Sequence, residues 1–410
     1  MDKKCKRSVA LYPLYGGFGV DLLFYVAIDT LFLTTVKGFT ESQFLILAAI
    51  ATSVSLVLRL PVLWLARKLG NTATLRIGAA CLLTGAILIT VGQNFATIVV
   101  GRCLRFVNSL ITDICLVATL ENNLARLGRE EAFLPIRAKG TTCYSALTLV
   151  IALVASTMFN IDPYFPMYCC IGGAAIAFVI SMLSGDYSGD LAETAAIKRE
   201  KKKFRLLPFL LIALLTYGIL FAAISNNIGD NKLFMQKEFQ KAVSLEQTAN
   251  LIGIIYFLSR LARLLSNLFF VRLYRRAKME TGFVVWSTAL VGFACVLGGS
   301  FLPAFWAKAL VMGLGYVMVL LCCDPVKLYI QQVIVVYSPR EQHRTLFAYM
   351  GFVFSIFTAM ISVLSPLAEM LSMATVSGLL MLMAAISLGF MFLLYRMLQK
   401  QTPVLTANGI

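Results

Sequence analysis

The chain has 410 residues, of which 59% are hydrophobic and only 14% are charged, and its mean hydropathy is +0.83. A soluble domain averages about 45–50% apolar and about 25% charged residues, so a soluble globular fold is excluded. Lysine and arginine total 36 against 20 acidic residues. Because these basic residues lie between long apolar runs, they indicate membrane topology and no nucleic-acid partner.

Apolar runs long enough to cross a bilayer recur twelve times along the chain. A hydrocarbon core of about 30 Å requires about 20 apolar residues in a helix. The alternating ten-residue segments of a membrane β-barrel are absent from the sequence. The first run follows a basic segment, residues 3–7, and we expect it to be an uncleaved membrane span. The sequence therefore predicts an all-α membrane protein with transmembrane helices at 11–35, 43–66, 75–93, 96–120, 138–159, 164–184, 206–228, 247–271, 280–301, 304–328, 345–367 and 371–397.

The basic residues gather in alternate loops between these predicted spans. Lysine and arginine near span ends stay on the cytoplasmic side of a membrane, so the basic loops are expected to be cytoplasmic. This orientation makes the protein a multi-pass protein of the cell membrane with both termini in the cytoplasm. The opposite loops hold only five basic residues, namely Lys37, Lys232, Lys237, Lys241 and Lys308.

A long polar stretch separates the sixth and seventh predicted spans. Residues 186–205 contain the run KREKKK and are expected to form a cytoplasmic linker. The linker divides the chain into two predicted six-helix bundles, residues 1–185 and 206–410. A contact between the basic run and anionic lipid is the alternative to a solvated loop.

The two halves repeat each other in sequence. Residues 40–70 align without gaps to 244–274, and residues 113–140 align to 324–351. Halves with six spans each and the same orientation imply parallel repeats about an axis along the membrane normal, an arrangement that secondary transporters use. The alignments superpose two pairs of charged residues, Arg59 on Arg263 and Asp113 on Asp324.

Two short segments match transporter motifs in part. The segment 63–72, after the second span, keeps Lys68 and Gly70 of the motif G-x-x-x-D-(R/K)-x-G-(R/K)-(R/K). The segment 102–106 keeps the arginine of R-x-x-Q-G. With its twelve spans, basic linker and duplicated halves, the chain resembles the major facilitator superfamily. The resemblance implies two pseudo-symmetric bundles and a central cavity lined by spans 1, 4, 7 and 10.

Charged side chains inside the predicted spans are the candidates for function. A charge at mid-bilayer costs at least about 2.5–3.5 kcal/mol, so it usually faces a cavity or a partner. Asp21 and Asp29 lie in span 1, and Arg102 and Arg105 lie in span 4. A low-dielectric surrounding favours the neutral acid and a nearby arginine favours the carboxylate, so Asp21 or Asp29 is predicted to carry a proton. The alternative is a fixed Asp29–Arg102 ion pair.

The charges shared by the two halves predict two symmetry-related ion pairs. Arg59 and Asp113 occur at similar depths on spans 2 and 4, and Arg263 and Asp324 repeat them in the second half. A charge that is duplicated in both halves is better explained by structure than by recognition of one solute. We therefore predict structural pairs Arg59–Asp113 and Arg263–Asp324.

The remaining intramembrane cations predict the solute. Arg260 has no counterpart in the first half, and arginine binds carboxylate and phosphate groups with a planar fork. Together with Arg102 and Arg105 it would attract an organic anion, while an amphipathic solute is the alternative. Uncharged hydrogen-bonding candidates for the same cavity are Tyr25, Tyr217, Asn226 and Asn227.

These observations predict a secondary active transporter that moves a small organic solute by alternating access and is coupled to protons. No phosphate-loop motif is present in the sequence, and the one histidine, His343, has no partners of a catalytic or metal site nearby. We therefore expect neither an enzymatic activity nor a bound cofactor or metal ion. The protein is expected to be a monomer. The alternatives are a lipid or lysolipid flippase on the same scaffold and a receptor without transport.

Overall fold

A computed structural model describes residues 2–129, 132–185, 207–338 and 340–400. Every regular element within these residues is helical, and twelve helices are long and apolar enough to cross a membrane. The predicted all-α architecture with twelve spans is therefore confirmed. By contacts between residues the chain divides into two compact units.

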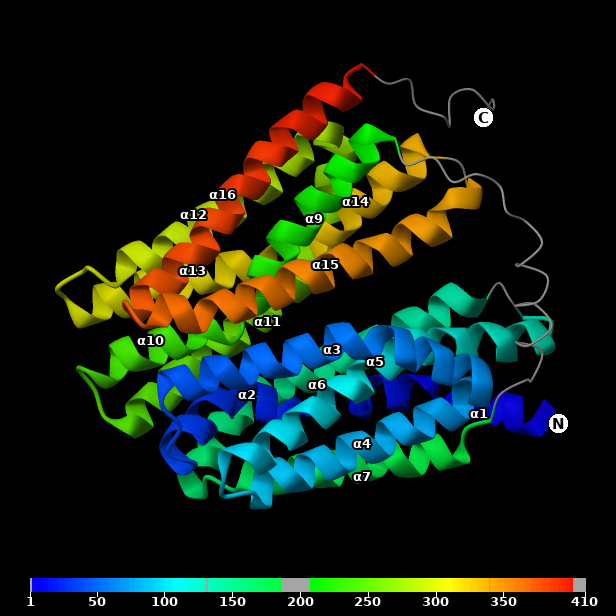
Figure 1. Ribbon diagram of the computed structural model, residues 1–410, viewed down its shortest axis with the longest axis horizontal. Coiled ribbons are helices and arrows are strands. Elements are labelled where there is room, and N and C mark those ends of the chain that lie inside the picture. Colours follow the sequence, from blue (N-terminus) through cyan, green and yellow to red (C-terminus); the bar gives the residue numbers. More distant parts are fainter. Residues whose placement is uncertain (1, 130–131, 186–206, 339, 401–410) are drawn as a thin grey trace. The chain divides into compact units, whose positions relative to one another are not determined.

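The first unit comprises residues 1–38 and 50–202. Its first predicted span is three pieces: a helix, a second short helix and a turn of π-helix. Helices α4 and α5 lie against each other, and α4 also runs beside α7 (Figure 1). The elements are α1 (Asp2–Phe18), α2 (Leu23–Leu31), η1 (Phe32–Val36), most of α3 (Glu41–Leu69), α4 (Asn71–Val91), α5 (Phe95–Arg126), α6 (Phe133–Ile161) and α7 (Phe165–Leu183).

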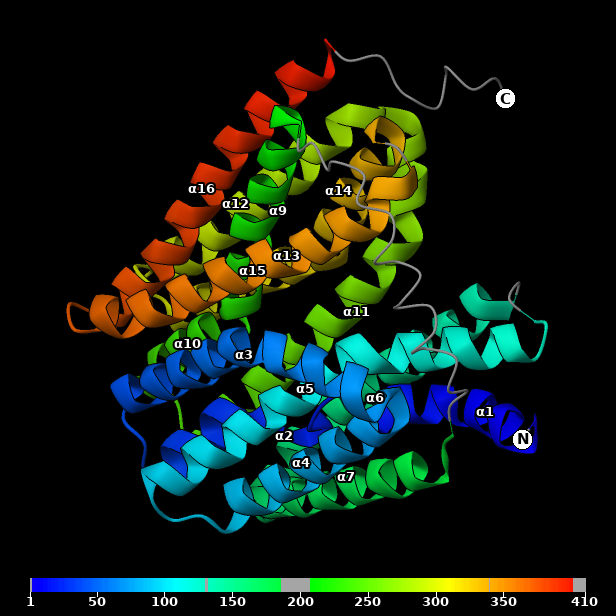
Figure 2. The ribbon, with the colours of Figure 1, turned by 45° about the vertical axis from the view of Figure 1, so that its right-hand side comes forward.

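The second unit comprises residues 39–49 and 203–410. The first turns of α3 therefore group with the second unit, a difference from the sequence-based boundaries of 1–185 and 206–410. Helix α9 packs against both α15 and α16 (Figure 2). The further elements are α9 (Pro208–Asn227), α10 (Asp230–Gln240), α11 (Leu245–Ala277), η3 (Lys278–Glu280), α12 (Thr281–Gly299), α13 (Phe305–Leu321), α14 (Cys323–Tyr337), α15 (Arg340–Glu369) and α16 (Met373–Leu398).

Both units contain helices that approach each other through facing glycines. On α4 and α5, a Cβ added to Gly85 would lie 2.7 Å from the carbonyl oxygen of Gly101. On α12 and α13, a Cβ added to Gly315 would lie 2.6 Å from the carbonyl oxygen of Gly292. Small residues allow such close backbone packing inside membranes. The two halves thus share a packing device in addition to their repeated charges.

Replacing Gly315 with alanine is expected to push α12 and α13 apart. The new Cβ would meet backbone atoms, which cannot rotate away as a side chain can, so we expect a loss of about 1–3 kcal/mol. Thermal unfolding of the purified protein in detergent measures the change. Gly298→Ala on α12 is the matched control, because no heavy atom lies within 4 Å of its added Cβ. Equal melting temperatures for the two variants would contradict this packing.

The core of the second unit is tied together by a short polar chain. The indole Nε1 of Trp286 on α12 donates to the hydroxyl of Ser387 on α16 at 2.8 Å. That hydroxyl in turn donates to the carbonyl oxygen of Thr216 on α9 at 2.7 Å. Both Trp286 and Ser387 are fully buried. Because a buried indole N–H needs an acceptor, these contacts fix the register of three helices.

Two of the predicted spans are interrupted, and a third is followed by an additional helix. The span expected at 11–35 is interrupted between α1 and α2, and α13 ends at Leu321, four residues before Pro325. A proline ring clashes with the carbonyl four residues earlier, which explains the second break. The span expected at 206–228 agrees with α9, but a second helix, α10, prolongs the candidate membrane stretch to Gln240 after a turn. Most of the loop expected after residue 228 is therefore helical, from Asp230 to Gln240.

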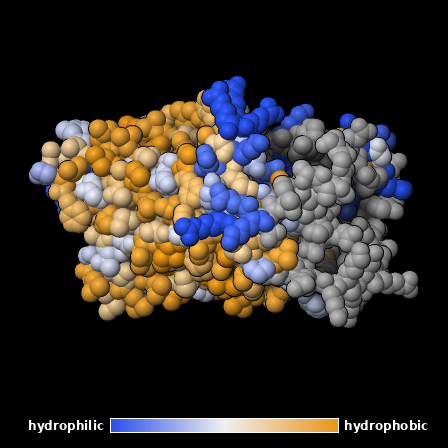
Figure 3. All heavy atoms as spheres, turned by 90° about the horizontal axis from the view of Figure 1, so that it is seen from above, coloured by the Kyte–Doolittle hydropathy of each residue, from blue (hydrophilic) through white to orange (hydrophobic). Residues whose placement is uncertain are grey.

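The outward surface of the helices matches a lipid environment. Apolar side chains cover most of the left-hand part of Figure 3, and hydrophilic side chains gather near the middle. Large hydrophobic side chains are exposed on the described helices, among them Leu60 and Trp64 on α3 and Phe269 on α11. In water such patches would promote association, whereas lipid tails cover them in a membrane.

Candidate functional site

The first candidate site is an ion pair within the first unit. Arg105 on α5 donates from Nε to Oδ1 of Asp21 at 2.5 Å and from Nη2 to Oδ2 at 2.8 Å. Two parallel charge-assisted hydrogen bonds make this the strongest geometry that arginine and a carboxylate form. Both side chains keep partial exposure, 14% for Arg105 and 22% for Asp21. A carboxylate that holds an arginine at mid-span and is still accessible can exchange a proton.

The break between α1 and α2 places Asp21 where it can meet Arg105. Asn108 on α5 is fully buried and donates to the carbonyl oxygen of Gly19 at 2.9 Å, which satisfies a backbone group that the interrupted helix leaves open. The Asp21 carboxylate accepts the backbone N–H of Leu22 at 2.7 Å, just before α2 begins. The same carboxylate therefore binds the backbone at the break and the arginine.

The other predicted residues of the first half surround this pair. Tyr25 is completely buried, and its backbone N–H donates to the thiol of Cys170 on α7 at 3.1 Å. The Arg105 guanidinium lies 5.6 Å from the centre of the Tyr25 ring. Arg102 and Asp29 are buried and near enough to act electrostatically on Tyr25, and Asp29 accepts the N–H of Thr30 at 2.8 Å. The structure thus brings all five predicted residues of spans 1 and 4 into one cluster.

In the second unit the predicted asparagines lie where α9 gives way to α10. Asn226 accepts from the hydroxyl of Ser362 on α15 at 2.8 Å and donates to the carbonyl of Ala222. Asn227 accepts from Asn231, one turn later, at 2.7 Å. Their side chains are buried and connect helices. Tyr217, also buried, stacks on Phe221 with ring centres 5.0 Å apart.

Sequence reasoning missed the burial of the polar residues on α10. Asp230, Asn231, Lys232 and Gln236 are all buried, and Lys232 is only 1% exposed although it was expected in an outer loop. The Asp230 carboxylate accepts from the hydroxyl of Ser365 on α15 at 2.7 Å. Because apolar and polar residues of α10 are buried alike, no single helix face in the sequence marks these positions.

Arg260 and Lys232 both lie against one aromatic ring, that of Tyr256. The Nη2 of Arg260 donates to the hydroxyl of Tyr256, and its guanidinium lies 4.7 Å from the ring centre. The ammonium of Lys232 lies 5.8 Å from the same centre. Tyr256 is itself buried. Lys232 and Arg260 thus bring two positive charges to one buried ring.

The predicted ion pairs have different outcomes in the two halves. Arg263 on α11 donates from Nε and Nη2 to the two oxygens of Asp324, each at 2.8 Å. Asp324 lies in the first turn of α14, where the helix dipole also favours a carboxylate. Arg59 is half-buried on α3 and Asp113 is exposed on α5. The pairing of these two stays a prediction.

Metal chemistry has no visible support in the described part of the chain. Within those residues, no group of three or more histidine, cysteine, aspartate or glutamate side chains is placed to hold a metal ion. His343 belongs to α15, but its side chain lies outside the described residues. The two clusters at the helix breaks are therefore the sites on which a function can be argued.

Comparison with known proteins identifies the fold. No family model matches the chain, and no curated protein matches it in sequence. Solved structures do match over almost its whole length. A variant of the nucleoside transporter NupG superposes with a TM-score of 0.72 at 11% identity, covering 94% of this chain and 99% of the transporter.

Two further structures agree with that match. The structure of NupG itself gives a TM-score of 0.68 at 13% identity, covering 97% of this chain and 98% of that one. A D-xylose-proton symporter gives 0.66 at 11% identity, with coverage of 94% and 96%. The chain therefore has the major facilitator fold that its sequence predicts. At these identities the likeness establishes the fold and leaves the solute to be argued from the residues.

Proposed function

We propose that the protein is a proton-coupled secondary transporter of a small organic solute that carries an anionic group. It acts as a monomer in the cell membrane, by alternating access, with both termini in the cytoplasm. The observation that carries the proposal is the two-bond Asp21–Arg105 pair at the break between α1 and α2. The fold shared with nucleoside and sugar-proton transporters supports the transport role.

The pair links the proton to the solute by competition for one arginine. As a carboxylate, Asp21 occupies both donors of Arg105 that face it. When Asp21 takes up a proton it loses its charge, and Arg105 becomes available to a carboxylate or phosphate of the solute. Proton binding and anion binding therefore favour each other, and thermodynamic linkage requires the effect to be reciprocal. This coupling is that of a proton–anion symporter.

The cluster on α10 and α11 supports the anionic character of the solute. Lys232 and Arg260 both lie against the buried ring of Tyr256, so two cations are available at one place. An arginine with its planar fork and a lysine as a point charge together suit a carboxylate or a phosphate monoester.

Proton movement in proteoliposomes tests the proposal. The purified protein is reconstituted with a pH-sensitive dye inside, and carboxylates, organic phosphates, nucleosides and pentoses are added outside. At least one anionic solute is expected to acidify the lumen, and a protonophore should abolish its accumulation. Accumulation that persists with the protonophore would contradict proton coupling. Transbilayer movement of labelled phospholipid without any solute uptake would favour the flippase alternative.

A further inference from the structure

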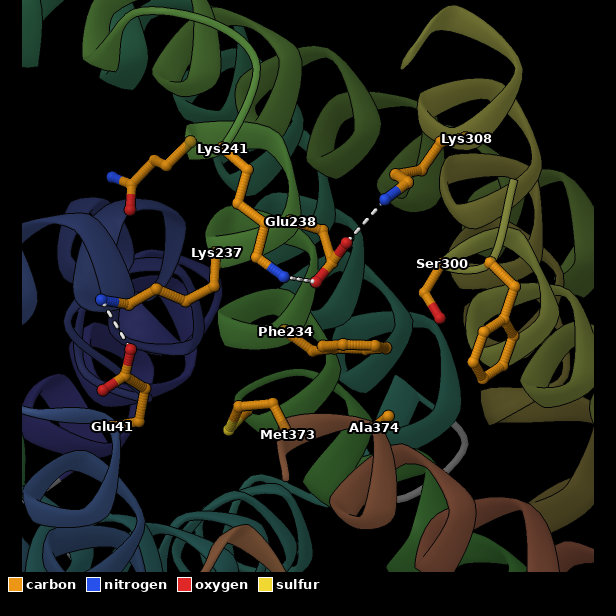
Figure 4. A pocket seen from close by; sticks show the side chains of 11 residues that line it. Glu41, Phe234, Lys237, Glu238, Lys241, Ser300, Lys308, Met373 and Ala374 are labelled. Atoms are coloured by element: carbon orange, nitrogen blue, oxygen red, sulfur yellow. Dashed lines mark hydrogen bonds and ion pairs between the residues drawn. The ribbon is translucent and has the colours of Figure 1, made fainter. Parts of the chain in front are cut away.

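The second unit contains a cavity that is separate from the Asp21–Arg105 cluster and from the cluster around Tyr256. Its volume is about 690 Å³, and it lies where the end of α10, the start of α13 and the start of α16 meet the first turn of α3 (Figure 4). Five charged side chains line it, and three of them are lysines: Lys237, Lys241 and Lys308 beside Glu41 and Glu238. The residues that line the cavity therefore carry a net charge of +1.

The charges of this wall are arranged around one shared carboxylate. Glu238 accepts from Lys241 through Oε1 and from Lys308 through Oε2, the latter at 2.7 Å. Lys237 reaches the other way, to Glu41, at 2.7 Å (Figure 4). One carboxylate cannot neutralise two ammonium groups, and each ammonium has three N–H donors of which these pairs use one. Lys241 and Lys308 thus keep charge and donors for another anion.

An apolar surface adjoins the lysines. Phe234, Met373 and Ala374 line the cavity, together with Phe301, whose side chain is 74% exposed at the turn between α12 and α13. Trp306, nearby on α13, is 72% exposed. An exposed aromatic rim beside a charged hollow suits a ligand with a charged head and an apolar part.

We infer that this cavity binds the carboxylate or phosphate of an amphipathic anion, with the head on Lys241 and Lys308 and the apolar part against Phe234 and Phe301. The ligand chemistry has two sources, a dissolved organic anion or the headgroup of an anionic phospholipid. The site lies in the second unit and does not use Asp21 or Arg105. It therefore holds or fails independently of the proposed transport cycle.

Hexyl phosphate is the probe, because it carries the charged head and a short apolar chain. Binding is measured as a rise in melting temperature of the full-length protein in nonionic detergent, with hexanol and inorganic phosphate as partial ligands. Removing both head contacts with K241Q/K308Q is expected to raise the Kd for hexyl phosphate at least tenfold. The matched control K139Q/K400Q removes two exposed lysines elsewhere and should leave the Kd unchanged. Equal Kd values for the two double variants would overturn the inference.

A second variant tests the apolar wall and guards against misfolding of the first. Phe301→Ala is expected to weaken hexyl phosphate several-fold and to leave the binding of inorganic phosphate unaltered. Equal weakening of both ligands would contradict the assigned orientation.

Nanodiscs of phosphatidylglycerol or phosphatidylcholine then distinguish a phospholipid headgroup from a dissolved organic anion. Loss of hexyl phosphate binding only in phosphatidylglycerol identifies the lipid headgroup, and equal binding in both identifies a dissolved anion. Asp21→Asn should bind hexyl phosphate as the unaltered protein does, whatever its transport.

Discussion

Asp21→Asn is expected to abolish solute accumulation driven by a pH gradient while exchange of solute across the membrane continues. Asparagine keeps an acceptor for the Leu22 N–H but has no negative charge for Arg105 and cannot carry a proton. Arg105 then faces a neutral side chain in every state, so binding of an anionic solute no longer depends on pH. The measurement is uptake into proteoliposomes with and without an imposed gradient, and stimulation by the gradient should fall at least tenfold.

The control for this experiment is Asp162→Asn. Asp162 is an exposed aspartate at the end of α6 that accepts the N–H of Tyr164 at 2.9 Å, a bond that asparagine can also accept. Its gradient-driven uptake should equal that of the unaltered protein. Accumulation by Asp21→Asn that still follows the gradient would remove Asp21 from the mechanism. Asp29, the second acid of the cluster, would then be the next residue to substitute.

Asp324→Ala is expected to destabilise the second unit. Removing one partner of a buried ion pair costs about 3–5 kcal/mol, because the other charge is left in a poor environment. The Arg263 side chain is 32% exposed, which reduces the expected loss to about 1–3 kcal/mol. The fall should appear as a lower melting temperature in detergent and a lower yield of folded protein.

The double variant Asp324→Ala/Arg263→Leu distinguishes a structural pair from a solute contact. If Arg263 and Asp324 only bind each other, removing both charges should recover most of the stability lost in the single variant. Transport should recover with it. Restored stability without restored transport would mean that the pair also takes part in solute handling.

The architecture was predictable because bilayer thickness and the cost of unpaired backbone groups restrict the chain to helices of one length. The repeated charges made the meeting of Arg263 with Asp324 predictable as well, since the same spacing recurs in both halves. Spans 1 and 4 were expected to bring acids and arginines together, and they do. Which acid meets which arginine depends on the interruption of the first span.

Two features could not be read from hydropathy. Lys232 follows directly on a polar run at 226–231, so an average over the window ends the span at 228, although the side chain is buried beside Tyr256. The close approach of Gly292 and Gly315 depends on how two helices rotate against each other. Both outcomes are decided by packing between elements, which local sequence patterns do not encode.

The contact between Asp21 and the Leu22 N–H has a mechanical consequence. The carboxylate that is proposed to accept a proton also accepts the amide N–H of Leu22, the residue just before α2. A protonated acid is a weaker acceptor, so neutralisation would loosen that amide at the moment when the guanidinium is set free. Protonation of Asp21 would then release Arg105 and weaken the contact at the break between α1 and α2 in the same step. No separate connection between the two events would be required.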